Sequence, residues 1–259
     1  MELDLIQVDA FASKPFTGNP AAVIPLNEWL PDVTLQAIAE ENNLSETAFF
    51  IPTARGYHLR WFTPISEVKL CGHATLASAF VIQTILGQGK GEILFETLSG
   101  DILVTHKDGL FTLNLPAQPP KKSIIPEIME VAFGVKILEC LEGEDYILVL
   151  EKAEQVKKVA PNFELLRQLP LRGVIITAVD KKFDFVTRFF APKYGVNEDP
   201  VTGAAFTQLF PYWGKKLQKN TFTAAQLSKR GGVVTGELLG DRVMISGRAR
   251  VYLTGKIKI

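Results

Sequence analysis

The side chain best suited to proton chemistry is a glutamate that lies beside an apolar segment. Glu46 directly precedes residues 47–51, a run too hydrophobic to lie at a protein surface. A carboxylate held against such a wall loses hydration, which raises its pKa and suits it to proton transfer near neutral pH. The same position is also typical of an ordinary solvent-exposed glutamate at the start of a strand. The residues alone leave both interpretations open.

Two glycines each open a short apolar segment of helical character. Gly72 precedes the run 73–77, and Gly203 is followed by Ala204. The first N–H groups of a helix lack intrahelical partners and attract anions, and a glycine lets a ligand approach the backbone. If two such helix ends face each other, they could hold a small carboxylate-bearing molecule without an arginine. Each glycine alone also fits tight packing.

Three more side chains near these glycines could take part in chemistry. His73 could carry a proton or donate a hydrogen bond to an anion, or it could simply bond a nearby carbonyl. Asp199 could cap the second helix or orient His73. Cys71 lies where a helix N-terminus would stabilise a thiolate, although many buried thiols are purely structural.

The composition excludes several classes of function. The 259 residues include 28 basic and 28 acidic side chains, so the formal net charge is zero and no nucleic-acid or membrane-surface partner is expected. Two cysteines and three histidines predict neither a disulfide framework nor a metal site. The N-terminus lacks the pattern of a signal peptide, and no apolar run is long enough to span a membrane. We therefore expect a cytoplasmic protein.

An internal repeat indicates two similar halves. The sequence Arg-Trp-Phe-Thr-Pro at 60–64 is echoed by Arg-Phe-Phe-Ala-Pro at 188–192, and each echo is followed by a loop and then by one of the two glycines. A third, looser echo relates residues 96–100 to residues 226–231. Three matches in the same order favour duplication. The proline-rich segment 116–122 predicts the boundary, giving domains 1–116 and 117–259.

Hydrophobic patterning predicts an α+β protein in which strands outnumber helices. The segment 74–86 is apolar nearly all round, so it should be a buried helix with a sheet curled around it. Its counterpart starts near Thr202 but meets Pro211, which should kink or end it. Strands are predicted at 3–11, 48–51, 57–62, 93–96, 102–106, 110–115, 174–178, 183–190, 222–225, 233–238, 243–246 and 251–253, and further helices at 32–43, 126–133 and 162–169.

Taken together, these motifs resemble the PhzF family of phenazine-biosynthesis-like isomerases. The resemblance covers nearly the whole chain. It rests on the segments 8–11, 16–20, 45–49, 60–64, 72–75, 190–192, 198–203, 211–213 and 226–232.

The resemblance implies a diaminopimelate-epimerase-like fold: two domains, each a barrel-like mixed sheet around a central helix, with the active site in the cleft between them. It implies a cofactor-independent isomerase in which Glu46 moves a proton between carbons of a small carboxylate-bearing metabolite. It also implies a homodimer. The residues assigned to the site are Glu46, His73 and Asp199 as catalytic groups and Asn19, Ser45, Gly72, Gly203 and Ala204 as substrate-binding groups, with Cys71 as a possible thiol.

The sequence departs from the family pattern at the second helix start. Ala204 and Phe206 stand where the family often has serine and histidine, which predicts a smaller or less polar substrate or a loss of activity. A racemase or epimerase of the two-thiol type is an alternative, but Val201 stands where the second thiol would be. A pair of Glu46 and Cys71 could still serve such a reaction. A catalytically inactive dimeric binding or scaffold protein is the other alternative.

Overall fold

A computed structural model describes residues 1–89 and 91–259 of the chain. The chain divides into two compact units. Unit 1 comprises residues 1–115 and 245–259, and unit 2 comprises residues 116–244. No helix in the described part of the chain is long and apolar enough to cross a membrane.

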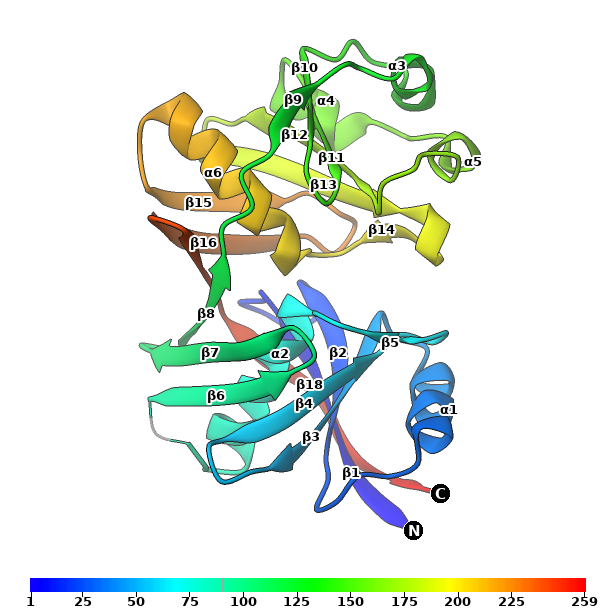
Figure 1. Ribbon diagram of the computed structural model, residues 1–259, viewed down its shortest axis with the longest axis vertical. Helices are drawn as coiled ribbons and strands as arrows, with labels where there is room; N and C mark the ends of the chain where they lie inside the picture. Colours follow the sequence, from blue (N-terminus) through cyan, green and yellow to red (C-terminus); the bar gives the residue numbers. More distant parts are fainter. Residues whose placement is uncertain (90) are drawn as a thin grey trace. The chain divides into compact units, whose positions relative to one another are not determined.

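Unit 1 is a curved mixed sheet. Its neighbouring strands follow the order β18–β1–β2–β3–β4–β6–β7–β8, with the short β5 paired to β4 (Figure 1). The β2–β3 and β4–β6 pairs are parallel, whereas the β1–β2, β3–β4 and β6–β7 pairs are antiparallel. The strands are β1 (Glu2–Ala10), β2 (Asn19–Pro25), β3 (Glu46–Pro52), β4 (Tyr57–Phe62), β5 (Glu67–Val68), β6 (Glu92–Thr97), β7 (Gly100–Lys107), β8 (Leu110–Pro116) and β18 (Ala249–Lys258).

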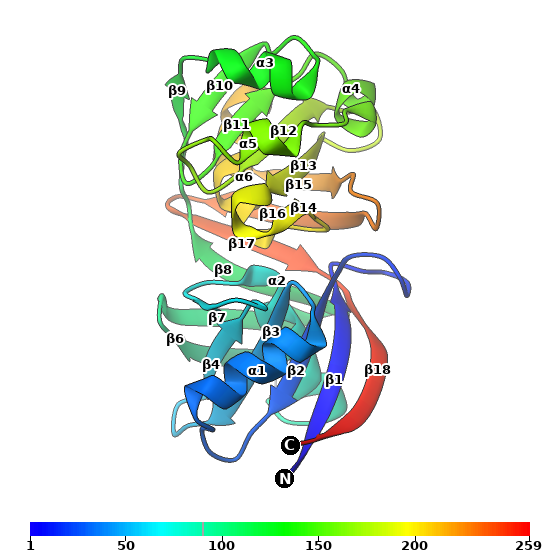
Figure 2. The same cartoon turned by 90° about the vertical axis from the view of Figure 1, so that its right-hand side faces the viewer.

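Two helices cover opposite faces of this sheet. Helix α2 (Gly72–Phe80) continues into a π-helical turn (Val81–Ile85) and packs on β1, β2, β3 and β18, while α1 (Asp32–Asn42) packs on β3 and β4 (Figure 2). The polar side chains of α2 bond back to its own turn: the hydroxyl of Thr75 donates to the carbonyl of Cys71 at 2.6 Å, and that of Ser78 to Ala74 at 2.8 Å. These bonds let a helix without a polar face lie in the core, as the sequence predicts.

Unit 2 is built on the same plan. Helix α6 (Phe206–Leu217) is its buried helix, and it follows a 3₁₀ turn at Gly203–Ala205. The strands are β9 (Lys121–Ser123), β10 (Glu139–Glu142), β11 (Tyr146–Val149), β12 (Val174–Val179), β13 (Phe185–Ala191), β14 (Val196–Asp199), β15 (Thr221–Gln226), β16 (Gly232–Leu239) and β17 (Arg242–Gly247), which crosses the unit boundary. The other helices are α3 (Glu127–Phe133), α4 (Ala153–Lys158), α5 (Phe163–Leu166) and a 3₁₀ turn at Pro192–Tyr194. The predicted α+β class with a central helix in each half is confirmed.

The strand pairings confirm the internal repeat. In unit 1, β4 pairs antiparallel with β3 and β5 and parallel with β6. In unit 2, β13 pairs antiparallel with β12 and β14 and parallel with β15. The repeated motifs 60–64 and 188–192 therefore occupy equivalent strands, β4 and β13.

The arginine that opens each repeated motif makes the same contacts in both units. Arg60 binds both carboxylate oxygens of Glu67, at 2.7 and 2.8 Å, and its guanidinium lies 5.1 Å from the ring centre of Phe62. Arg188 binds both oxygens of Glu198, at 2.6 and 3.0 Å, and lies 4.9 Å from the ring centre of Phe190. In each unit the arginine of the repeated motif therefore links two strands: β4 to β5 in unit 1 and β13 to β14 in unit 2.

Pro211 neither ends nor interrupts α6, contrary to the sequence-based expectation. A proline inside a helix leaves the carbonyl four residues earlier without its usual N–H donor. Here that carbonyl belongs to Thr207, and it accepts the backbone N–H of Gln118 at 2.9 Å. The hydroxyl of Thr207 also donates to the side-chain carbonyl of Gln118 at 3.1 Å. A segment outside the helix supplies the missing hydrogen bond, so the helix continues.

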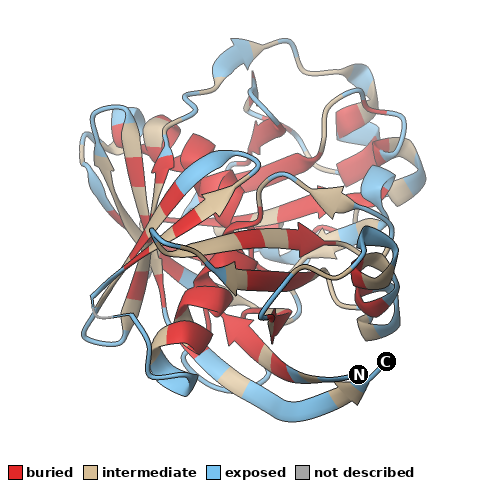
Figure 3. Ribbon diagram, turned by 60° about the horizontal axis from the view of Figure 1, so that its bottom comes forward, coloured by how far each residue is buried: buried red, intermediate tan, exposed pale blue. Residues whose placement is uncertain are grey.

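The last strand of the chain belongs to unit 1. β18 pairs antiparallel with β1 along nearly its whole length, from Lys258 opposite Glu2 to Ala249 opposite Ala10. The expected second domain, 117–259, therefore loses its C-terminal segment to the first. Most of β18 is exposed, as the strand that ends at the C-terminus shows in Figure 3. Pairing with β1, rather than burial of its side chains, holds β18 in place.

The matched ion pairs predict matched losses of stability. We expect Glu67→Gln and Glu198→Gln each to lower the free energy of unfolding by about 2 kcal/mol, because each removes the carboxylate that binds a largely buried arginine through two hydrogen bonds. Arg60 keeps a second ion pair, with the exposed Asp32 at 2.9 Å, so the loss in Glu67→Gln should not exceed that in Glu198→Gln. Urea unfolding followed by circular dichroism measures both.

Glu2→Gln is the control for this pair. This substitution weakens the ion pair between Glu2 and Lys256, whose side chains are 46% and 60% exposed, respectively. The free energy of unfolding should therefore change by no more than about 0.5 kcal/mol. Losses at Glu67 and Glu198 no larger than that of the control would contradict the equivalence of the two arginines.

Candidate functional site

Glu46 is the first residue of β3, and the strand's alternation turns its side chain toward α2. Phe49 belongs to the core cluster that includes Leu35 and Ile38 of α1, so odd-numbered residues of β3 face α1. Side chains of a strand alternate between faces, which places Glu46 with Ala48 on the opposite face, where α2 lies. The side chain of Glu46 retains 19% of its exposure. It therefore lies at the edge of the core, as a reactive carboxylate requires.

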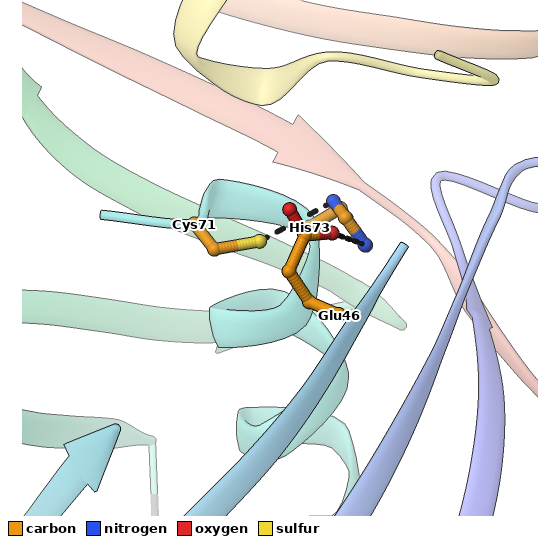
Figure 4. A group of neighbouring side chains, drawn as sticks. All are labelled: Glu46, Cys71 and His73. Carbon is orange, nitrogen blue, oxygen red and sulfur yellow. Dashed lines mark hydrogen bonds and ion pairs between the residues drawn. The ribbon is translucent and has the colours of Figure 1, made fainter. Parts of the chain in front are cut away.

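The start of α2 brings a histidine and a cysteine to this carboxylate (Figure 4). Nε2 of His73 lies 3.2 Å from Oε2 of Glu46. Nδ1 of His73, on the other side of the ring, lies 3.5 Å from Sγ of Cys71. Cys71 is the N-cap residue of α2 and Gly72 its first helical residue, and both are buried. Glu46, Cys71 and His73, which the sequence analysis assigns to one site, therefore lie side by side.

Asn19 completes the surroundings of the imidazole from β2. Its amide nitrogen Nδ2 lies 3.2 Å from Nδ1 of His73, although the two residues are 54 positions apart. The strand pairing explains the meeting, because β2 runs parallel to β3 with Ala21 opposite Glu46. Ser45 immediately precedes β3 and is partly buried. Six of the predicted site residues, including Cys71 and Gly72, thus lie within one unit and around one helix start.

The imidazole of His73 is neutral at physiological pH. Its exposed fraction is 4%, and this burial lowers the pKa of His73 to about 3, because the charged ring would lose its hydration. A hydrogen bond with the backbone of Pro20 works in the opposite direction and is the weaker effect. A neutral ring has one N–H donor and one bare acceptor nitrogen, so it can connect an acceptor on one side to a donor on the other.

The same trio has ligand types found in transition-metal sites. One ligand atom from each of Glu46, Cys71 and His73 lies within 4.8 Å of the others. However, Glu46 faces Nε2 and Cys71 faces Nδ1, and a metal ion binds along the lone pair of a single ring nitrogen. The observed arrangement suits hydrogen bonding along the ring better than joint coordination of one ion.

The remaining predicted residues lie in unit 2. Asp199 ends β14, and its carboxylate accepts a hydrogen bond from the hydroxyl of Thr202. Gly203 and Ala204 form the buried 3₁₀ turn that precedes α6. Their part in substrate binding stays a prediction.

Sequence reasoning missed the residue that organises this loop of unit 2. Gln226 is fully buried, accepts the N–H of Thr202 at 2.9 Å and donates to the carbonyl of Asp199 at 2.7 Å. Ser228 donates to the carbonyl of Pro200 at 2.8 Å. Both belong to the echo at 226–231, which was the available signal. That echo marks a turn that braces the start of α6.

Comparison with known proteins identifies relatives along the whole chain. The family described as phenazine biosynthesis-like protein (PhzC-PhzF) matches residues 8–256. An uncharacterized isomerase of Pseudomonas aeruginosa is 47% identical, with 100% of both chains covered.

Solved structures share the fold. A PhzF-family phenazine biosynthesis protein of Enterococcus faecalis matches with a TM-score of 0.97 and 45% identity over 100% of both chains. A hydroxyproline epimerase of Agrobacterium vitis matches with a TM-score of 0.64 and 10% identity over 99% of this chain and 92% of its own, a likeness of fold alone. The names of the close relatives support an isomerase-type enzyme.

The lowered pKa of His73 predicts a dependence of stability on pH. Between about pH 6.5 and pH 3 the unfolded chain binds a proton at this residue and the folded chain does not, so the free energy of unfolding falls as the pH falls through that window. The contribution is up to about 1.4 kcal/mol for each pH unit. In urea unfolding between pH 7 and pH 4.5, His73→Gln should therefore lose stability less steeply than the wild type. Equal slopes for the two proteins would contradict the neutral, buried imidazole.

Proposed function

Because the chain belongs to the phenazine biosynthesis-like protein family, we propose that it is an isomerase that moves a proton between two carbons of a small carboxylate-bearing metabolite. Glu46 is the general acid and base. The observation that carries the proposal is the position of this carboxylate: it is partly exposed at the start of β3, with one oxygen 3.2 Å from Nε2 of a buried, neutral histidine.

The arrangement supports Glu46 as the group that first accepts the proton. A base must have its reacting atom accessible while the rest of the group is held in place. The 19% exposed fraction of the side chain leaves part of the carboxyl group within reach of a small molecule. On the core side, the buried oxygen Oε2 lies 3.2 Å from Nε2 of His73. An exposed loop glutamate would have no such fixed orientation.

The proposed reaction removes one proton from the substrate and returns one proton to it, so it needs no other reactant. Glu46 takes a proton from one carbon, and the electron pair left behind is delocalised toward an electron-withdrawing carbonyl or carboxylate of the substrate. Donors aimed at the developing negative charge stabilise it, and the first N–H groups of α2, beginning at Gly72, supply such donors. Glu46 then returns the proton to a second carbon. The product is an isomer, and no cofactor or metal takes part in the proposal.

The other assigned residues enter the proposal as substrate contacts. Ser45 lies next to Glu46 in the chain and could bind the substrate through its hydroxyl. Asp199, Gly203 and Ala204 are proposed to contribute from unit 2, Asp199 as a hydrogen-bonding or relay group. Phe206 is fully buried at the start of α6, so it acts on the substrate only through the shape of that turn. A homodimer and a cytoplasmic location also stay predictions.

A racemase or epimerase using Glu46 and Cys71 is the second candidate. The presence of a thiol in the same cluster favours it, since Sγ of Cys71 lies 3.5 Å from the ring that contacts Glu46. Inversion at carbon needs a base on each face of the carbon atom, and the two groups could supply one each. The proton would then return to the same carbon rather than to a different one.

Removal of the carboxylate tests the general base. The protein is incubated with a metabolite extract in deuterated water, and mass spectrometry identifies compounds that gain one deuteron. We expect Glu46→Gln to slow this exchange by at least about 100-fold, because the amide keeps the shape but accepts no proton.

Glu41→Gln, at an exposed glutamate of α1, is the matched control and should exchange at the wild-type rate. Undiminished exchange in Glu46→Gln would overturn the proposal. Absence of exchange in all three proteins would identify the fold as a binding or scaffold protein.

Replacement of the thiol separates the two candidate reactions. Cys71→Ser should leave the rate of proton transfer within about threefold of the wild type if Glu46 alone moves the proton. If Cys71 is the second base, the rate should fall by about 100-fold or more, because a serine hydroxyl is a far weaker proton acceptor than a thiolate. The product gives a second criterion: a constitutional isomer supports the isomerase, and a stereoisomer supports the epimerase.

A further inference from the structure

We propose that Asn19 is a positioning residue that keeps the single proton of the neutral His73 ring on Nε2, facing Glu46. Sequence reasoning placed Asn19 among the substrate-binding residues. Its side chain is fully buried and its amide faces the imidazole. Asn19 therefore acts through His73 rather than on a bound molecule.

The hydrogen-bonding capacity of the Asn19 amide selects this tautomer. The amide nitrogen of Asn19 can only donate, so Nδ1 of His73, 3.2 Å away, must be the bare acceptor nitrogen. The ring proton then resides on Nε2, which lies 3.2 Å from Oε2 of Glu46. An ionised carboxylate can only accept, so a donor at that nitrogen is compatible with Glu46, although Nε2 and Oε2 approach each other without the alignment of a hydrogen bond. The amide of Asn19 is therefore the group that selects the tautomer.

Cys71 is the other group that reaches Nδ1, and its influence should be smaller. Its sulfur lies 3.5 Å from Nδ1, and a thiol is a weak donor compared with an amide. A thiol can also act as a weak acceptor, so it does not by itself exclude a proton on Nδ1. The amide of Asn19 does exclude it.

The conformation of the loop between β1 and β2 determines where the amide of Asn19 lies. Gly18 adopts a φ of +71°, and a Cβ atom there would lie 2.1 Å from the carbonyl oxygen of Ala10, so only glycine fits. Phe16 also has a positive φ, of 68°, and its N–H donates to a carboxylate oxygen of the buried Asp9 at 3.0 Å. Strained backbone conformations persist where the surrounding structure enforces them, often at functional sites. Here they lead directly into Asn19.

The consequence for chemistry rests on the proposed function of Glu46. A donor at Nε2 stabilises the ionised carboxylate, which is the form that can take a proton from carbon. If the ring proton moved to Nδ1, a lone pair of Nε2 would face the carboxylate, and Glu46 would have to hold a proton to bond it. The Asn19 amide thus keeps Glu46 ready as a base.

The tautomer itself can be measured without a substrate. Long-range ¹H–¹⁵N correlation spectra of protein labelled with ¹⁵N-histidine distinguish protonated from bare ring nitrogens, and the signals lost in His73→Gln assign His73 among the three histidines. We expect a protonated Nε2 and a bare Nδ1 throughout pH 5–8. In Asn19→Asp the new carboxylate should accept from Nδ1, so the spectrum should show a protonated Nδ1, either in the other tautomer or in the imidazolium form.

Cys71→Ala is the matched control, since it removes the other neighbour of Nδ1. It should leave the wild-type tautomer unchanged. A wild-type ring protonated on Nδ1, or a change of tautomer in Cys71→Ala, would overturn the proposal. If Asn19→Asp does not fold, the wild type and Cys71→Ala still decide, because a bare Nδ1 that survives loss of the thiol leaves Asn19 as its donor.

The exchange assay then separates this inference from the proposed function. If both hold and the ring of Asn19→Asp carries its single proton on Nδ1, this variant should slow deuterium exchange by about 100-fold or more, as expected when a catalytic histidine is held in the wrong tautomer. An imidazolium in this variant keeps the proton on Nε2 and should exchange at nearly the wild-type rate. A changed tautomer without a changed exchange rate would keep the inference about Asn19 and refute the catalytic role of Glu46 beside His73.

Discussion

A buried imidazole has one proton to place on two nitrogens, and this constraint organises the first unit of the protein. His73 is too deeply buried to be charged, so one of its nitrogens must donate and the other must accept. A carboxylate oxygen lies 3.2 Å from one nitrogen, and an amide nitrogen lies 3.2 Å from the other. The strained β1–β2 loop, the parallel β2–β3 pair and the N-terminus of α2 each contribute one of these groups. Three elements distant in sequence are therefore positioned around one ring.

Duplication of the fold did not duplicate the chemistry. Both units keep the arginine that ties a short strand to the sheet, at Arg60 and Arg188, and both bury the helix that follows. At the helix start, however, the first unit has Cys71 and His73, whereas the second has Thr202 and Ala204. The cluster of Glu46, Cys71 and His73 belongs to unit 1, and unit 2 has a network of hydroxyl, amide and backbone groups around the carboxylate of Asp199. The two copies of the fold therefore carry different side chains at the same position, and the proposed proton transfer belongs to the first.

The sequence predicts those elements whose periodicity is simple. The apolar run after Gly72 is a buried helix because it has no polar face, and the echo at 60–64 and 188–192 locates β4 and β13. β2 is missed because prolines at both of its ends, Pro20 and Pro25, are typical of loops. α6 is predicted to break because the sequence does not reveal that Gln118 satisfies the carbonyl freed by Pro211. Such compensation depends on a contact between distant segments.

The candidate site shows the same division between local and distant information. Glu46, Cys71 and His73 could be chosen from their types, their neighbours and the family resemblance. The role of Asn19 could not, because it depends on which of its amide atoms meets which nitrogen of a ring 54 residues away. A sequence motif can single out a residue, but its role depends on which of its atoms donate hydrogen bonds and which accept them. An asparagine that the sequence suggests as a ligand-binding group is buried against His73, where we propose that it determines which ring nitrogen carries the proton.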